Sequence, residues 1–253
     1  MKAPLILACG LLALAAPVAP AAERELFGRS VEGRPLIAVH SGNSHAAVSV
    51  LVIGAIHGDE AAGMRIARRL VAAGAPHGVD LWVVPSLNPD GVTAHTRGNA
   101  HGVDLNRNWP FGWRPLDGGE YSGPRALSEP ESRAGRRLIQ RIRPDLTIWF
   151  HQPFGLVDAS GNQPWVERRF ADLVGLPFSH LPGRYPGSAS RWQNHAFPQS
   201  TAFVVELPAT VSTALSRRAS AAVRTLAAEL ASPGVDPATD FVRPIARTKS
   251  ATR

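Results

Sequence analysis

The sequence contains almost no cysteine. Cys9 is the only one among 253 residues. A single thiol cannot form an internal disulfide, and it cannot supply the paired cysteines of structural zinc sites. Because Cys9 lies in an apolar N-terminal run that export would remove, we expect the mature protein to have no thiol. Thiol catalysis and cysteine-ligated metals are therefore excluded, and the composition is compatible with an oxidising compartment.

The sequence also lacks internal repeats, low-complexity linkers and any dense stripe of basic residues interleaved with aromatics. Lysine and arginine together number 27 against 20 acidic residues, and arginine greatly outnumbers lysine. Without a basic and aromatic stripe, this surplus gives little support for nucleic-acid binding. The charge could attract acidic substrates, or it could serve only solubility. An apolar content of 44% is enough for one ordinary globular core.

The first 22 residues have the pattern of an export signal. Lys2 gives a positive start, residues 5–16 are almost entirely apolar, and residues 19–21 place small side chains at a cleavage site. The apolar run is too short to span a bilayer comfortably, although an anchor that stays attached is the alternative. We expect a periplasmic or secreted protein with one folded domain at 23–232 and a loose polar tail at 233–253.

Strand-like and helix-like segments alternate through the rest of the chain. The predicted strands span residues 48–56, 79–84, 146–150 and 202–207, and the predicted helices span residues 59–73, 128–142, 164–174 and 211–231. Ser128 with Glu131 predicts a capping box at the start of the second helix. Residues 91–127 lack such patterns, and a stretch of that length usually carries function. The alternation predicts an α/β sheet with helices on both faces.

Ionisable side chains follow three of the predicted strands. His57 follows the first strand, His151 follows the third, and Glu206 lies near the end of the fourth. In α/β sheets the ligand site lies outside the carboxyl ends of the strands, so these side chains are expected to converge. Glu206 follows four residues that are all apolar. Burying a carboxylate there costs several kcal/mol unless a partner compensates, which indicates a metal site or an active site.

His57 and Glu60 lie three residues apart at a predicted strand-to-helix junction, where Gly58 lets the chain turn. This spacing brings an imidazole and a carboxylate to the same side. Both groups are ordinary zinc ligands, and a catalytic zinc commonly has three protein ligands and one open position. His151 is the natural third ligand. Taken alone, the pattern is weak, because a hydrogen-bonded loop histidine or a satisfied core histidine would look the same.

The segment 104–109, DLNRNW, together with HGDE at 57–60, resembles the zinc carboxypeptidases of the M14 type. Further matches follow in the same order: NPDG at 88–91, Thr96-Arg97, YSGP at 121–124, SEPE at 128–131, then His151 and Glu206. The resemblance covers roughly residues 48–208, and the small bacterial branch that includes murein peptide amidase is the most similar. It implies a single α/β domain with a twisted, mixed but mostly parallel central sheet flanked by helices.

The resemblance implies a catalytic role for five positions. His57, Glu60 and His151 would hold one zinc ion. Glu206 would be the general base that takes a proton from the attacking water and passes it to the leaving amine. Arg97 would stabilise the oxyanion beside the metal, and a positive donor so placed contributes on the order of 3 kcal/mol.

Four further positions would bind the substrate. Asn106 and Arg107 would hold the carboxylate of the departing residue, because a guanidinium fork matches a carboxylate. Tyr185 lies near the place of a family tyrosine that covers the substrate, although residues 184–188 fit that pattern only in part. Arg191 would suit an acidic or zwitterionic side chain such as that of diaminopimelate, unless it points to solvent. The implied enzyme is a monomer that cleaves the γ-D-glutamyl-diaminopimelate bond of peptidoglycan peptides and keeps no membrane anchor.

Three other functions fit parts of the pattern. An ordinary periplasmic carboxypeptidase would act on α-linked peptides. An amidohydrolase of the aspartoacylase or succinylglutamate desuccinylase type shares the HxxE motif, but the NRNW and SEPE segments count against it. A non-catalytic relative that binds cell-wall peptides would be expected to have lost a ligand or the base, whereas His57, Glu60, His151 and Glu206 are all present.

Overall fold

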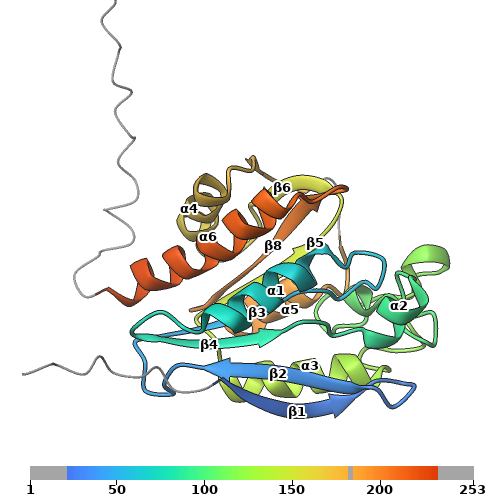
Figure 1. Ribbon diagram of the computed structural model, residues 1–253. Coiled ribbons are helices and arrows are strands. Elements are labelled where there is room, and N and C mark those ends of the chain that lie inside the picture. The colour runs from blue at the N-terminus through green and yellow to red at the C-terminus, as the bar shows by residue number, and fades with distance from the viewer. Residues whose placement is uncertain (1–21, 182–184, 233–253) are drawn as a thin grey trace, which may run out of the picture.

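Eight strands form one sheet in the computed structural model, which describes residues 22–181 and 185–232 (Figure 1). The strands are β1 (Glu23–Arg29), β2 (Pro35–Ser41), β3 (Val48–Ile53), β4 (Val79–Val84), β5 (Leu146–His151), β6 (Phe154–Asp158), β7 (Phe178–Ser179) and β8 (Thr201–Pro208). The helices are α1 (Ala62–Ala73), α2 (Pro89–Ala94), α3 (Pro130–Ile142), α4 (Pro164–Val174), α5 (Ala189–Ala196) and α6 (Thr213–Ala231), with 3₁₀ turns η1 (Leu105–Arg107) and η2 (Gly118–Glu120).

The sheet is mixed and mostly parallel, as expected. Its strand order is β1-β2-β4-β3-β5-β8-β6-β7, and the central strands β4, β3, β5 and β8 run parallel to one another. Antiparallel pairs join β1 to β2, β2 to β4 and β6 to β8. The four predicted strands are the four central ones, because only strands buried on both faces read as continuous apolar runs. The flanking strands β1, β2, β6 and β7 were missed.

Two layers of helices cover the sheet (Figure 1). Alternate residues of the central strands face α1, α4 and α6, among them Val50, Val52, Phe150, Phe203 and Val205. The residues between them, among them Leu51, Ile53, Trp149 and Val204, face the other way and share a core cluster with Trp109 of the segment after β4. This alternation is the period of a β-strand, and it fixes which side chains of β5 and β8 reach the second face.

The helix starts differ in detail from the predictions. Helix α4 has the predicted bounds, whereas α1 begins at Ala62 rather than residue 59, and α6 begins at Thr213 after Ser212 caps it. The capping box at Ser128 was wrong. Helix α3 begins at Pro130, its N-cap is Glu129, and the Ser128 hydroxyl donates to Glu129 Oε1 at 2.7 Å. A proline at the first helical position sets that start.

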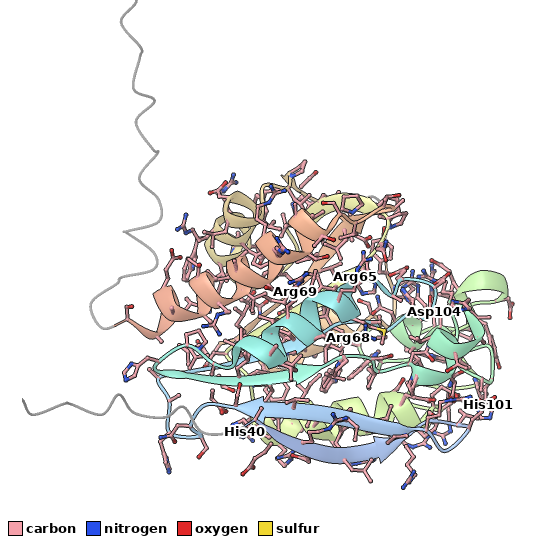
Figure 2. The ribbon with its side chains drawn as sticks, in the orientation of Figure 1. His40, Arg65, Arg68, Arg69, His101 and Asp104 are labelled. Atoms are coloured by element: carbon pink, nitrogen blue, oxygen red, sulfur yellow. The ribbon has the colours of Figure 1, made fainter. Side chains whose placement is uncertain are left out.

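The segment between β4 and α3 is packed into the molecule although most of it is irregular. Its side chains Val103, Leu105 and Trp109 are fully buried. Asn99 Nδ2 donates to Glu129 and to Glu131 at 2.8 and 3.1 Å, which ties the segment to the start of α3. Figure 2 shows Asp104 and His101 on this segment, at the end of the molecule toward which the arrow of β4 points. The segment therefore forms one wall beside the carboxyl ends of the parallel strands.

The expected export signal at 1–22 and the tail at 233–253 lie almost wholly outside the described residues. Within the described ranges, no helix combines the length and the apolar character needed to cross a bilayer. The described chain starts next to β1, whose first residue is Glu23.

Candidate active site and metal centre

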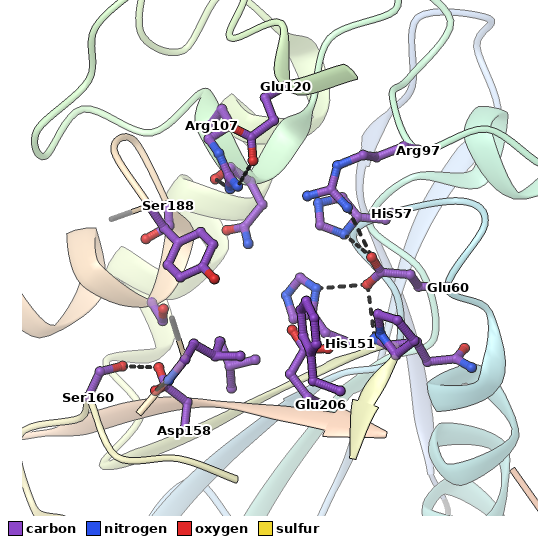
Figure 3. Close-up of a pocket in the computed structure, with 18 of the residues that line it drawn as sticks. His57, Glu60, Arg97, Arg107, Glu120, His151, Asp158, Ser160, Ser188 and Glu206 are labelled. Carbon is purple, nitrogen blue, oxygen red and sulfur yellow. Dashed lines mark hydrogen bonds and ion pairs between the residues drawn. The ribbon is translucent and has the colours of Figure 1, made fainter. Parts of the chain in front are cut away.

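The three expected metal ligands converge at the carboxyl end of the parallel strands (Figure 3). His57 and Glu60 lie in the turn between β3 and α1, and His151 is the last residue of β5. Their ligand atoms all lie within 4.8 Å of one another, and all three side chains are buried. A strand end and a tight turn thus supply two imidazoles and one carboxylate, which is the donor set of a catalytic zinc site.

The Glu60 carboxylate lies between the two imidazoles. Its Oε2 is 2.9 Å from His151 Nδ1, and its Oε1 is 2.9 Å from His57 Nδ1. Burial alone would raise the pKa of Glu60, but its close contacts with His151 and His57 hold that pKa well below its usual range. Burial lowers the pKa of His151. The carboxylate is therefore ionised, as a metal ligand must be.

The geometry around His57 fits a metal ion. Its Nε2 lies 3.0 Å from Asp104 Oδ1, which leaves Nδ1 as the free ring nitrogen on the side of Glu60. That Nδ1 is buried, and its contact with Glu60 lacks hydrogen-bond geometry. A carboxylate behind a ligating histidine fixes the ring and raises its basicity. Burial opposes protonation of this ring, yet the charge of Asp104 raises the pKa of His57 to about 9, so the pocket favours a positive charge there.

Arg97 links the ligand Glu60 to Asp104. Its Nε donates to Asp104 Oδ2 at 2.9 Å, and its Nη1 donates to Glu60 Oε1 at 3.1 Å. Burial would lower the pKa of Arg97, but the charges of Asp104 and Glu60 raise it. The guanidinium is thus held beside the metal position, where it can face an oxyanion.

Glu206 lies on β8, directly opposite His151 of β5 and Leu156 of β6. Residues opposite one another in a sheet point to the same face, so Glu206 faces the cavity on the same side as His151. Its carboxyl is buried, and Oε2 has no hydrogen-bond partner among the described residues. Burial, together with the charge of Glu60, raises the pKa of Glu206 to about 7. A carboxyl with a pKa near neutrality suits a group that takes and returns a proton.

Arg107 lies across the cavity from Glu206 (Figure 3), and Asn106 precedes it on η1. Asn106 Oδ1 accepts a hydrogen bond from the backbone of Ala189 at 3.0 Å, which joins η1 to the start of α5. Arg107 is buried, donates to Glu120 Oε1 at 2.6 Å, and lies 5.1 Å from the ring centre of Tyr185. Its Nε has no hydrogen-bond partner among the described residues. The guanidinium therefore keeps donor capacity for a bound carboxylate.

One cavity of about 1060 Å³ joins these groups, and all nine predicted site residues line it: His57, Glu60, Arg97, Asn106, Arg107, His151, Tyr185, Arg191 and Glu206. Arg191, on α5, is exposed and lies 3.5 Å from the backbone oxygen of Tyr185. Gly187 lets this wall approach η1, because a Cβ at Gly187 would lie 2.3 Å from the backbone oxygen of Arg107, and its φ is +66°. The structure thus brings together residues that are far apart in the sequence.

Sequence reasoning did not single out three acidic side chains at the site. Asp104 stands in the DLNRNW segment, but only its contact with His57 shows that it supports a ligand. Glu120 ends the short 3₁₀ turn η2, and no local pattern in the sequence marks it. Asp158 also lines the cavity, at the end of a strand that was not predicted. Pairing in space, rather than spacing in the chain, identifies all three.

Comparisons with known proteins agree with this geometry. The family model described as zinc carboxypeptidase matches residues 13–157. Murein peptide amidase A of Escherichia coli K12 is 31% identical over 66% of this chain and 75% of its own length, and that of Vibrio campbellii is 33% identical over 72% and 78%. The crystal structure of murein-tripeptide amidase MpaA from Escherichia coli O157 superposes with a TM-score of 0.67 at 27% identity, covering 84% of this chain and 93% of that one.

The donor set, the buried carboxyl of Glu206 opposite His151 and the family match lead to one assignment. His57, Glu60 and His151 form a site able to hold a metal ion, and the matched family is defined by zinc. The chain therefore belongs to the zinc carboxypeptidase family of peptidases, and its cofactor is zinc.

Proposed function

We propose that this protein hydrolyses the amide bond between γ-D-glutamate and diaminopimelate in peptidoglycan peptides. The observation that carries the proposal is a single cavity lined by the metal site, by Glu206 and by the guanidinium groups of Arg107 and Arg191. Such a cavity suits a substrate that carries free carboxylates near the scissile bond. The likeness to murein peptide amidases from two bacteria supports the choice of substrate.

In the proposed reaction, zinc held by His57, Glu60 and His151 supplies Lewis acidity. Glu206 takes a proton from the attacking water and returns it to the departing amine, and its raised pKa of about 7 suits both steps. Arg97 is held by Asp104 and by the ligand Glu60, so its guanidinium is fixed before the substrate binds. This preorganisation places a positive charge where the oxyanion forms.

Asn106 and Arg107 would bind the carboxylate next to the scissile nitrogen. The side-chain oxygen of Asn106 accepts a hydrogen bond from the Ala189 backbone. The side-chain NH₂ group of Asn106 is therefore turned toward other acceptors. The Tyr185 ring beside Arg107 would cover the bound residue. Burial and the charge of Glu206 raise the pKa of Tyr185, so its hydroxyl stays protonated and can donate a hydrogen bond.

We further propose that the protein works outside the cytoplasm, where peptidoglycan is remodelled. The signal-like pattern at 1–22 supports this. Fractionation of cells followed by N-terminal sequencing tests it. A mature N-terminus near residue 23 in the periplasmic fraction is expected, and an intact N-terminus in the cytoplasm would contradict it.

The substrate assignment is tested with the zinc-loaded enzyme and two peptides. One is L-alanyl-γ-D-glutamyl-meso-diaminopimelate, and the other is a blocked α-linked dipeptide. We expect release of diaminopimelate from the first, measured by mass spectrometry. The matched variant Glu206→Gln should lose at least about a hundredfold in kcat and still bind one zinc ion per chain. Turnover of the α-linked dipeptide alone would refute the peptidoglycan assignment in favour of an ordinary carboxypeptidase.

A further inference from the structure

Asp158 is a buried carboxylate inside the cavity that the reaction described above does not use. It ends β6, is 6% exposed, and lines the same cavity as the metal ligands. In Figure 3 it lies with Ser160 on the side of the cavity away from Arg97 and His57. A carboxylate so placed is costly unless its charge is matched.

Only neutral groups hold Asp158 among the described residues. The Ser160 hydroxyl donates to Oδ2, and the backbone of Leu181 donates to Oδ1 at 2.9 Å. No arginine, lysine or histidine of residues 22–181 and 185–232 forms an ion pair with it. An ionised carboxyl can accept about four hydrogen bonds, and two are used here. Capacity therefore remains for a donor that enters with the substrate.

The pairing of β6 with β8 fixes how far Asp158 lies from Glu206. Leu156 of β6 lies directly opposite Glu206 of β8, and Asp158 is two residues further along β6. Residues two apart in a strand face the same side, so Asp158 is a diagonal neighbour of Glu206, and such neighbours lie roughly 7–8 Å apart. Val204, two residues before Glu206, also lines the cavity and lies on the same face. The separation of Glu206 and Asp158 is about the length of an extended lysine side chain.

The cavity is lined by charged groups of both signs. Arg107 on η1 and Arg191 on α5 line the cavity with positive charge, Glu120 pairs with Arg107, and Asp158 adds a negative charge from the end of β6. A departing residue with one carboxylate beside the scissile nitrogen and one amino group at its far end matches this arrangement. A departing residue with an apolar side chain would leave the Asp158 carboxylate buried without a counter-charge.

We infer that Asp158, held by Ser160 and the Leu181 backbone, binds the amino group at the end of the departing residue's side chain. This rests on the proposed function and deepens it, because diaminopimelate carries such a group. Asp158 thereby selects lysine-like and diaminopimelate-like residues over apolar ones of equal length. The carboxylate would form charge-assisted hydrogen bonds with the incoming ammonium.

The test compares three γ-D-glutamyl peptides that end in meso-diaminopimelate, lysine or norleucine, the last being the lysine analogue without an amino group. The native enzyme should prefer the first two. Asp158→Asn should lower kcat/KM for the diaminopimelate and lysine peptides by about 10–100-fold. It should change kcat/KM for the norleucine peptide by less than about threefold. Calorimetric binding of free diaminopimelate and free norleucine provides a reading that needs no turnover, and the variant should weaken only the first.

Two controls separate recognition from structure. Ser160→Ala removes a support but leaves the carboxylate, so the preference for an amino group should persist. Asp172→Asn makes the same chemical change on the exposed side of α4 and should leave all three peptides unchanged. An equal loss on all three peptides in Asp158→Asn would show a structural role and overturn the inference, as would an unchanged preference.

The same series in α-linked form keeps the two proposals distinguishable. If only blocked α-linked dipeptides are cleaved, the peptidoglycan assignment fails, and the ratio of C-terminal lysine to C-terminal norleucine turnover then tests Asp158. If Asp158→Asn loses the preference for lysine over norleucine, the inference is supported. If the variant keeps that preference, the inference is overturned.

Discussion

Replacing Glu167 with glutamine should change how the stability of the protein depends on pH. Glu167 lies on α4 and is fully buried. Its Oε1 accepts from the Thr201 hydroxyl at 3.2 Å, while Oε2 has no partner in the described part of the chain. A Cβ on Gly161 would lie 2.0 Å from Oε1, so the backbone closes over the carboxyl. Burial raises the pKa of Glu167 from 4.5 to about 7.

The direction and size of the effect follow from that pKa. Below pH 4.5 the carboxyl is protonated in both the folded and unfolded chains, and its contribution to stability is fully present. Between pH 4.5 and about 7 the unfolded chain loses the proton while the folded chain keeps it, so stability falls as pH rises. At about 1.4 kcal/mol per pH unit, the loss levels off above pH 7 at roughly 3 kcal/mol.

Glutamine cannot ionise, so it removes this loss. The difference in unfolding free energy between Glu167→Gln and the native protein should rise by roughly 3 kcal/mol from pH 4 to pH 8. Urea unfolding followed by tryptophan fluorescence measures it, with chelator in both samples so that metal binding does not contribute. Asp172→Asn, on the exposed side of the same helix, is the control and should give a flat difference. A flat difference for Glu167→Gln would refute the reasoning.

Two further predictions concern the site. Asp104→Asn should lower zinc affinity about 10–100-fold, because Asp104 orients His57. Competition with a chelator measures the affinity. An unchanged affinity would show that Asp104 does not support the metal site. Glu120→Gln should lower the KM of carboxylate-bearing substrates by up to about fivefold, since the half-exposed Glu120 pairs with Arg107 and exposed pairs contribute at most about 1 kcal/mol. A raised KM would mean that Glu120 positions Arg107 for the substrate instead of competing with it.

The sequence allowed the centre of the fold to be predicted, but not its edges. Strands β3, β4, β5 and β8 are buried on both sides, so their apolar runs are visible without any partner. Strand β1 is largely exposed and β7 has two residues, and such strands are defined by their neighbours. The capping box failed at Ser128 because Asn99, more than twenty residues away, hydrogen-bonds Glu129 and Glu131.

The site residues divide in the same way. His57, Glu60, His151 and Glu206 could be predicted because each stands at a strand end or strand-to-helix turn and matches a family motif. Asp158 stands in no motif, and its relation to Glu206 depends on the antiparallel pairing of β6 with β8. Sequence spacing cannot give that pairing, because the two residues are far apart in the chain and their strands run in opposite directions.

The packed segment between β4 and α3 has a consequence for how the active site opens. Arg97, Asp104 and Arg107 stand on this segment, and Val103, Leu105 and Trp109 of the same segment belong to the buried interior. Segments that open locally have few buried apolar contacts. Here, exposing the backbone of the site would also expose a tryptophan and break the Asn99 contacts to α3. Amide hydrogens around η1 should therefore exchange as slowly as those of a core element, although the chain there is mostly irregular.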